Sequence, residues 1–365
     1  MTLADLLVQT VAMNGSDLHL TEGSPPRVRV DGELQVLREA PLTAADTRDL
    51  VLSALTDAQQ ARLQSVMELD AACQVEGLGR FRCNAFHQRG TLAAVYRHIP
   101  DQVCSLAELG LPPVLSDLAR RPRGLVLVTG PTGSGKSTTL AAMVSQINGE
   151  RRGHILTIED PIEFVHAHGQ SVVNQREVGR DTPTFTAALR AALREDPDVV
   201  LVGEMRDLES VEAALRIAET GHLTLATLHT SSAAQTITRI IDVCPAGQQE
   251  RVRTQVSLVL EGVVCQALLP RAGGGRVAAL EVLIPTPAIR NLIRENKVHQ
   301  IYAAMQAGRG RSGMQTMNHA LAALCRRGST TRDAAVAVSS LPEELIAMLA
   351  RPEAVAGRWA AAREP

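Results

Sequence analysis

The chain has 365 residues, of which 45% are hydrophobic and 21% are charged, and its formal net charge is −2. This length predicts two or three domains, and this composition is that of a globular protein with a sizeable core. A charge so close to zero gives no overall attraction to nucleic acid or to an anionic membrane, although local basic patches are compatible with it.

The cysteines and the apolar runs place the protein in a reducing compartment. The six cysteines include no C-x-x-C pair, so a structural zinc site and a thioredoxin-like motif are unsupported. The N-terminus carries no basic and apolar signal sequence, and no apolar run approaches the ~20 residues of a membrane span. We therefore expect a cytoplasmic protein with reduced thiols.

Residues 1–100 predict a small α+β domain. Leucines recur at helical spacing from Leu3, and Asp31-Gly32 lies between two alternating runs, which is typical of a hairpin. Helical patterns occupy 42–68. The strand-like runs of this region are 17–20, 27–30, 33–36, 70–76, 80–86 and 91–98.

The pattern changes after this domain. Residues 101–123 predict a linker with one short helix at 114–118, bounded by prolines. Residues 124–285 alternate strands and helices, which indicates a parallel sheet with crossover helices, and residues 286–365 are mostly helical. The expected core strands are 125–129, 154–159, 199–203, 223–228 and 277–283.

A glycine-rich stretch after the first of these strands fits the phosphate-loop spacing G-x-x-x-x-G-K-[ST], with a helical pattern following it. Successive backbone N–H groups can converge there on phosphate oxygens, while Lys136 reaches the β- and γ-phosphates and Ser137 binds Mg²⁺. The alternative is a glycine turn without a ligand. We predict a nucleoside triphosphate site made by Gly130, Pro131, Thr132, Gly133, Ser134, Gly135, Lys136, Ser137 and Thr138.

Hydrolysis requires a positioned water and a metal ion besides the loop. Glu204 follows the apolar run 199–202, so it is expected at the carboxyl end of a strand, where ligands of such sheets bind. There it can orient or deprotonate water. A solvated loop acid is the alternative.

A second acidic group follows the strand-like run 154–159. We expect Glu163 to coordinate Mg²⁺ directly or through water, with Glu159 and Asp160 supporting it. A purely structural role for Glu159 and Asp160 is equally compatible with the pattern.

Two histidines flank the run 223–228. His229 stands at the end expected to face the nucleotide, and a functional role is favoured over that of ordinary surface or core histidines. Zinc binding is not favoured, because no third ligand of the zinc type lies near them in the sequence.

Arginines of the N-terminal domain supply a further charge. Arg82 and Arg97 lie on strand-like runs, and a guanidinium can bind γ-phosphate oxygens in a bidentate manner. From periodicity alone, solvated arginines on a sheet face are the better interpretation.

Several of these stretches together resemble the secretion ATPases, the motors of type II and type IV secretion and of type IV pili. The resemblance covers nearly the whole chain. Its motifs are the phosphate loop, SDLHL at 16–20, TIEDPIEF at 157–164, VNQREVG at 173–179, LREDPDVVLVGEMRD at 193–207, GHLTLATLHTSSA at 221–233, GGGRVAALEVL at 273–283 and AIRNLIRE at 288–295.

The resemblance implies a PAS-like N-terminal domain and a RecA-like ATPase domain, assembled as a homohexamer that uses ATP and Mg²⁺. It implies that Glu204 is the catalytic glutamate and that Glu163 lies near the metal. His229 and His222 match the histidine pair of the family, in catalysis and nucleotide binding respectively. It also makes Arg82 and Arg97 the arginines that reach the phosphates.

AIRNLIRE, with GMQTMN at 313–318, is characteristic of the branch of the family that retracts pili. That branch implies an inner-membrane platform protein (PilC-like) as partner, membrane association through partners only, and a function opposed to the pilus extension ATPase. Extension ATPases carry a tetracysteine zinc site, which this sequence lacks. Cys244-Pro245 departs from the family, which usually has an aromatic residue before this proline, and this puts packing details in doubt.

Three other functions stay open from the sequence. They are a pilus assembly or type II secretion ATPase, a nucleic-acid translocase on the same core, and a nucleotide-dependent switch without turnover. The net charge of −2 and the 2% of aromatic residues disfavour the translocase.

Overall fold

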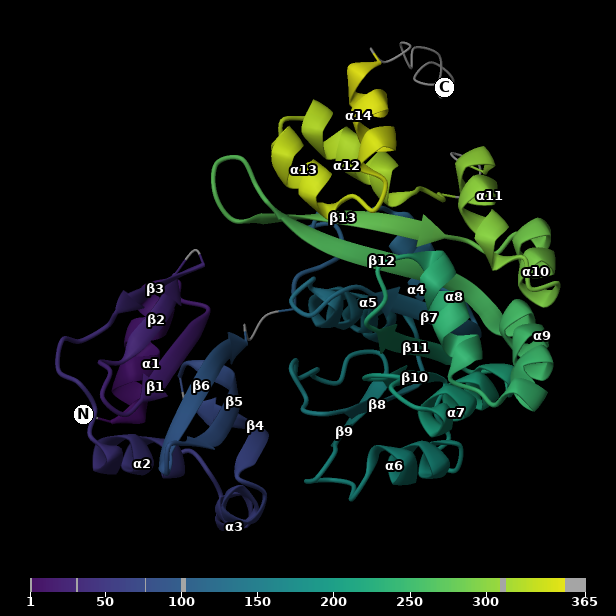
Figure 1. Cartoon of the computed structure of the whole chain (residues 1–365). Helices are drawn as coiled ribbons and strands as arrows, with labels where there is room; N and C mark the ends of the chain where they lie inside the picture. Colours follow the sequence, from purple (N-terminus) through teal and green to yellow (C-terminus); the bar gives the residue numbers. More distant parts are fainter. Residues whose placement is uncertain (1, 31, 76, 100–102, 309–312, 352–365) are drawn as a thin grey trace. The chain divides into compact units, whose positions relative to one another are not determined.

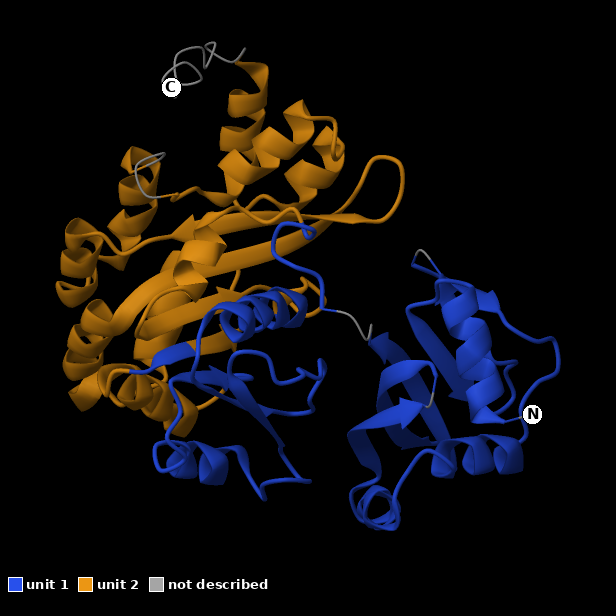
Figure 2. Ribbon diagram, turned by 180° about the vertical axis from the view of Figure 1, so that it is seen from behind, with its two compact units in different colours: residues 1–109, 137–205, 222–224 blue, residues 110–136, 206–221, 225–365 orange. Residues whose placement is uncertain are grey.

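The computed structural model describes residues 2–30, 32–75, 77–99, 103–308 and 313–351. The predicted turn residue Asp31 and the last fourteen residues of the chain lie outside these ranges. The chain divides into two compact units (Figure 2): unit 1 comprises residues 1–109, 137–205 and 222–224, and unit 2 comprises 110–136, 206–221 and 225–365. The predicted boundaries at 100, 123 and 285 stay predictions.

The N-terminal part of unit 1 is an antiparallel sheet with helices (Figure 1). Its described strands form a six-stranded sheet in the order β3-β2-β1-β6-β5-β4. Its elements are α1 (Leu3–Ala12), β1 (Asp17–Thr21), β2 (Arg27–Val30), β3 (Glu33–Val36), α2 (Ala44–Leu52), α3 (Asp57–Val66), β4 (Glu68–Val75), β5 (Gly79–Gln88) and β6 (Thr91–Ile99). The predicted α+β character of this region is confirmed.

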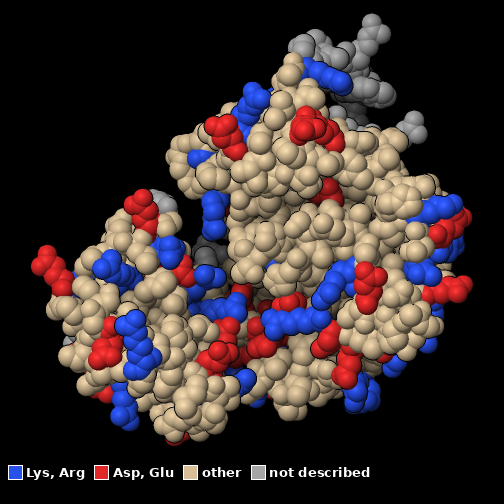
Figure 3. Space-filling view, viewed as in Figure 1, with Lys and Arg blue, Asp and Glu red and all other residues tan. Residues whose placement is uncertain are grey.

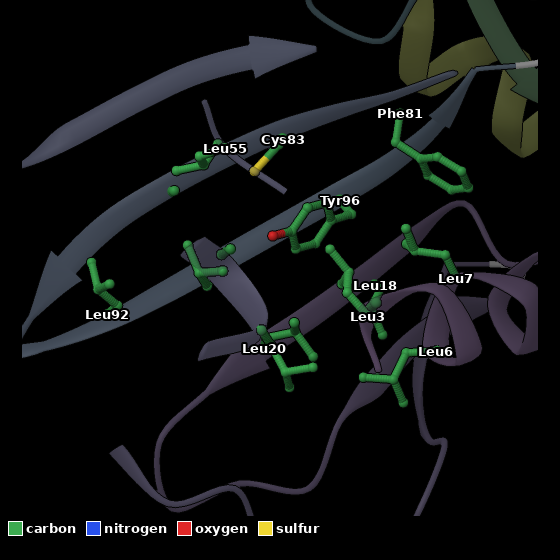
Figure 4. Close-up of a cluster of buried hydrophobic side chains, with 14 of the residues drawn as sticks. Leu3, Leu6, Leu7, Leu18, Leu20, Leu55, Phe81, Cys83, Leu92 and Tyr96 are labelled. Carbon is green, nitrogen blue, oxygen red and sulfur yellow. The ribbon is translucent and has the colours of Figure 1, made fainter. Parts of the chain in front are cut away.

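Local sequence explains where these helices begin. Thr2, Thr43 and Thr56 each accept a hydrogen bond from the backbone N–H three residues later, and the side chain of that later residue accepts one from the threonine backbone N–H. The inward faces then meet in one core of leucines around Phe81 and Tyr96, both fully buried (Figure 4). Each buried leucine of this cluster contributes about 1.5–3 kcal/mol to folding.

The second sheet has seven strands in the described residues, in the order β13-β12-β7-β11-β10-β8-β9. Strand β8 pairs in parallel with β9 and β10, and β7 pairs in parallel with β12, whereas β12 and β13 are antiparallel. The predicted α/β fold with a mainly parallel sheet is confirmed. Its elements are β7 (Gly124–Thr129), α5 (Lys136–Glu150), β8 (His154–Glu159), β9 (Val172–Glu177), α6 (Phe185–Ala192), β10 (Val199–Val202), α7 (Leu208–Glu219), β11 (Leu223–Leu228), α8 (Ala233–Asp242), α9 (Gln249–Val259), β12 (Leu260–Pro270) and β13 (Arg276–Leu283).

The sequence analysis missed two of these strands, β9 and β12. Strand β12 follows α9 directly, without a glycine or proline to separate them, so its apolar run cannot be told from a continuing buried helix. Strand β9 has only two apolar residues, Val172 and Val173, followed by four polar ones, so it shows no apolar run.

The described residues after 285 are mostly helical, as predicted. Helix α12 packs on β13 and α13 on β12, around the fully buried Leu321 and Leu345. The α-helices not yet given are α4 (Val114–Ala119), α10 (Pro287–Arg294), α11 (Ile301–Ala307), α12 (Met317–Arg326), α13 (Arg332–Val338) and α14 (Pro342–Ala350). Among the described residues, no helix is long and apolar enough to cross a membrane.

Candidate active site

The predicted phosphate loop joins the end of β7 to the start of α5. Strand β7 is buried along its whole length, and α5 begins at Lys136. Gly130 and Gly135 have φ values of 143° and 87°, which side-chain-bearing residues rarely adopt. The backbone therefore curls at the N-terminus of a helix, which is the arrangement that binds phosphate groups.

Lys136 is folded back over the loop that it follows. Its Nζ donates to the carbonyl oxygens of Gly130 and Pro131 at 2.8 and 3.1 Å, and lies 3.4 Å from His229 Nδ1. Two residues from distant parts of the sequence, Lys136 and His229, are thus brought together in unit 2.

The hydroxyl groups of the loop differ in exposure. Ser137 is exposed at the first turn of α5 and Thr138 is half-buried. Ser134 Oγ is buried and has no hydrogen-bond partner among the described residues. A buried hydroxyl without a partner costs free energy, and a phosphate oxygen in the loop would supply the missing partner.

The loop is supported from behind by Gln266, a residue that the sequence analysis missed. This side chain, on β12, is buried, and its Nε2 donates to the Ser134 carbonyl oxygen at 2.8 Å. A glutamine within an apolar run is the signal that could have identified it.

Of the predicted acidic residues, Glu159 is engaged in hydrogen bonds. It ends β8 and accepts from Thr157 Oγ1 at 2.6 Å and from Gln175 Nε2 at 3.2 Å. Burial raises the pKa of its carboxyl group to about 7. Asp160 is exposed. Among the described residues, no group of three or more histidine, cysteine, aspartate and glutamate side chains is arranged to hold a metal ion.

Glu163 and Arg82 form an ion pair within unit 1. Arg82 Nη1 donates to Glu163 Oε1 at 3.0 Å, and its Nε donates to Asp70 Oδ1 at 3.1 Å. The arginine therefore bridges two carboxylates. The partner Asp70 was not identified from the sequence, because the pairing depends on the register of β4 against β5.

Arg97 lies opposite Arg82 on the neighbouring strand β6. Its Nε donates to Asp17 Oδ1 at 2.8 Å, and Asp17 is buried whereas the arginine side chain is more than half exposed. Asp17 belongs to the SDLHL stretch and was not assigned a role from the sequence. This hydrogen bond fixes the Nε side of the Arg97 guanidinium group, and the remainder of the guanidinium group stays accessible.

Glu204 and the two histidines lie at strand ends. Glu204 is half-buried and follows β10 through Gly203, whose N–H donates to the Ile158 carbonyl at 2.8 Å. His222 and His229 stand at opposite ends of β11, which puts them roughly 20 Å apart at the rise of a strand. One phosphate group of a nucleotide cannot touch both.

The predicted site residues are divided between the two compact units. Lys136 and His229 belong to unit 2, as do the loop residues 130–135. The remainder belong to unit 1, and they are Arg82, Arg97, Ser137, Thr138, Glu159, Asp160, Glu163, Glu204 and His222.

Comparison with known proteins gives consistent matches. Residues 2–336 match the family described as Type II/IV secretion system protein. The chain is 50% identical over 343 residues to the "Type IV pilus retractation ATPase PilT" of Pseudomonas aeruginosa, covering 94% of this chain and 99% of that protein. It is also 50% identical over 311 residues to the "Twitching motility protein" of Neisseria gonorrhoeae, covering 85% of this chain and 83% of that one.

A solved structure, "Crystal Structure of the Pilus Retraction Motor PilT and Bound ADP", is similar with a TM-score of 0.86 and 50% identity. The match covers 95% of this chain and 99% of that one. The family predicted from the sequence motifs is therefore confirmed: the chain belongs to the type II/IV secretion system protein family, the secretion ATPases.

Proposed function

We propose that this protein is an ATP-hydrolysing motor that powers the retraction of type IV pili. The observation that carries the proposal is the Gly130–Ser137 phosphate loop, in a chain half identical over nearly its full length to a pilus retraction ATPase. The fold of the loop and the unpartnered Ser134 hydroxyl support nucleotide binding by this chain itself.

The loop binds the phosphates of ATP through its backbone N–H groups and through Lys136. In the structure Lys136 Nζ is held by two loop carbonyls, so it is already directed over the loop. Ser137 and Glu163 would hold Mg²⁺, which neutralises phosphate charge, and phosphate and water oxygens would complete its coordination. Glu159 is poorly suited to the metal, because burial raises the pKa of its carboxyl group to about 7.

Glu204 orients the water that attacks the γ-phosphorus and accepts its proton as the bond to the bridging oxygen breaks. Arg82 and Arg97 stabilise the charge that spreads over the γ-phosphoryl oxygens. His229, which lies next to Lys136, also takes part in catalysis. ATP binding brings the arginines of the N-terminal domain to the phosphates, and hydrolysis releases them. This coupling converts the chemical step into motion.

The motor works as a homohexamer at the cytoplasmic face of the inner membrane. It reaches the membrane through a PilC-like platform protein and opposes the extension ATPase. AIRNLIRE lies largely on α10, where Ile289 and Ile293 are buried and Arg290 binds Glu261 at 3.0 Å. The motif is thus part of the packed structure, which suits a role in passing ring motion to the pilus machinery.

A nucleic-acid translocase is not favoured by the surface. On the face drawn in Figure 3, basic and acidic side chains are interspersed, whereas a translocase groove has one sign of charge.

Piliation of a strain without this protein tests the function. Retraction predicts hyperpiliated cells without twitching motility, restored by a plasmid copy of the wild-type chain. Bald cells would contradict retraction and establish an assembly role. Wild-type piliation and motility would contradict both.

A further inference from the structure

Gln266 stands out among the buried polar side chains of unit 2. It lies on β12, within an apolar strand, and is only 4% exposed. β12 pairs in parallel with β7 so that Cys265 is level with Thr129. Gln266 consequently comes level with Gly130, where the phosphate loop begins.

Both glycines that flank the loop are in close contact with this residue. A Cβ atom on Gly130 would collide with the Gln266 carbonyl oxygen, and one on Gly135 would lie 2.8 Å from Gln266 Nε2. The backbone of Gln266 thus lies against Gly130, and its side chain occupies the space behind Gly135.

The amide group of Gln266 also fixes a peptide plane of the loop. Its Nε2 donates to the Ser134 carbonyl oxygen at 2.8 Å. In a trans peptide the carbonyl of one residue and the N–H of the next point in opposite directions. Holding the Ser134 carbonyl toward β12 therefore turns the Gly135 N–H away from β12.

Such a restraint is needed at this position because Gly135, with φ of 87°, has access to alternative backbone conformations. A rotation of the Ser134–Gly135 peptide would present a carbonyl oxygen, in place of an N–H, to the anionic ligand. We propose that Gln266 is a positioning residue that presets the phosphate loop for the polyphosphate chain of its nucleotide. This inference rests on the proposed nucleotide binding and adds a residue outside the family's phosphate-loop motif.

The test is nucleotide affinity of the full-length wild-type protein and of Gln266→Leu, measured by calorimetry with ATP, ADP and adenosine. Loss of the donor should raise the Kd for ATP and ADP about tenfold, because part of the binding free energy is then used to order the Ser134–Gly135 peptide. The Kd for adenosine should not change, because it has no phosphate for the loop to bind. A general loss of packing would weaken all three ligands alike.

Gln315→Leu is the matched control. Its Nε2 donates to the Leu280 carbonyl at 2.8 Å, so the exchange also removes one glutamine–carbonyl bond, away from the loop. This variant should bind ATP as the wild type does. Gln266→Met, which keeps the side-chain length without the donor, decides the question if Gln266→Leu does not fold.

The outcomes separate the inference from the proposed function. Wild-type protein that binds no ATP would overturn both. If the wild type binds ATP and the Gln266 variant binds ATP and ADP as tightly as the wild type does, only the positioning role is overturned. The same holds if the variant loses as much affinity for adenosine as for ATP and ADP.

Discussion

Arg82 on β5 and Glu163 after β8 are paired through Nη1 and Oε1 at 3.0 Å, although 80 residues separate them in the chain. The sequence motifs predict that Arg82 reaches the phosphates and that Glu163 lies near the metal ion. In the structure they bind each other, so each charge is stabilised by its partner. Both side chains of the pair are about one-third exposed. Because water screens their attraction, the pair contributes at most about 1 kcal/mol to the free energy of unfolding.

Removal of Arg82 should therefore affect catalysis more than folding. We expect Arg82→Ala to lower the kcat for ATP hydrolysis about 100-fold, because a charge that stabilises the transition state is lost. Arg82→Lys should not restore it, since lysine cannot bind Asp70 and a second anion through one planar group. Steady-state ATPase assays of the assembled protein check this.

The control for Arg82 is Arg89→Ala, an exposed arginine at the turn between β5 and β6. It should hydrolyse ATP at the wild-type rate. An Arg82→Ala protein as active as Arg89→Ala would show that Arg82 is a surface arginine, the alternative that the sequence left open.

The strands and helices that could be predicted are those with one dominant pattern. β7 and β11 are mainly apolar and buried along their whole length, and the threonine caps of α2 and α3 follow directly from local sequence. β12 was missed because nothing separates it from α9. With the strand, Gln266 was missed as well.

The partners of the site residues could not be predicted for a different reason. Asp17 meets Arg97 because β1 and β6 pair in a specific register, and Asp70 meets Arg82 through the register of β4 and β5. A shift of one residue would place each aspartate on the other face of the sheet. Such long-range pairing is a property of the folded sheet and leaves no local signal.

Lys136 gives a prediction about binding. Lys136→Ala should raise the Kd for ATP by at least about tenfold, because charge-assisted hydrogen bonds to phosphate are worth about 1.5–3 kcal/mol. Lys297→Ala, an exposed lysine paired with Glu295, is the control and should leave the Kd unchanged. Equal affinities for both variants by calorimetry would refute the role of the loop.

Glu159 gives a prediction about pH. Burial raises the pKa of its carboxyl group from 4.5 to about 7, so the folded state binds this proton more tightly than the unfolded state. Its contribution to the free energy of unfolding is complete below about pH 4.5 and is lost as the pH rises to about 7. Glu159→Gln, which is always neutral, avoids this loss.

Urea unfolding at pH 5 and at pH 8 checks the Glu159 prediction. The free energy of unfolding of Glu159→Gln, relative to wild type, should increase by about 3 kcal/mol between these pH values. A difference that is independent of pH would contradict the assignment.

Glu204→Gln tests most directly whether this chain hydrolyses ATP bound in its own phosphate loop with Glu204 as the group that activates water. Measured on the assembled protein, the ATPase rate should fall at least about 100-fold while the Kd for ATP stays within about threefold of wild type. Glu209→Gln, exposed on α7, should keep the normal rate. A normal rate in Glu204→Gln would contradict the account.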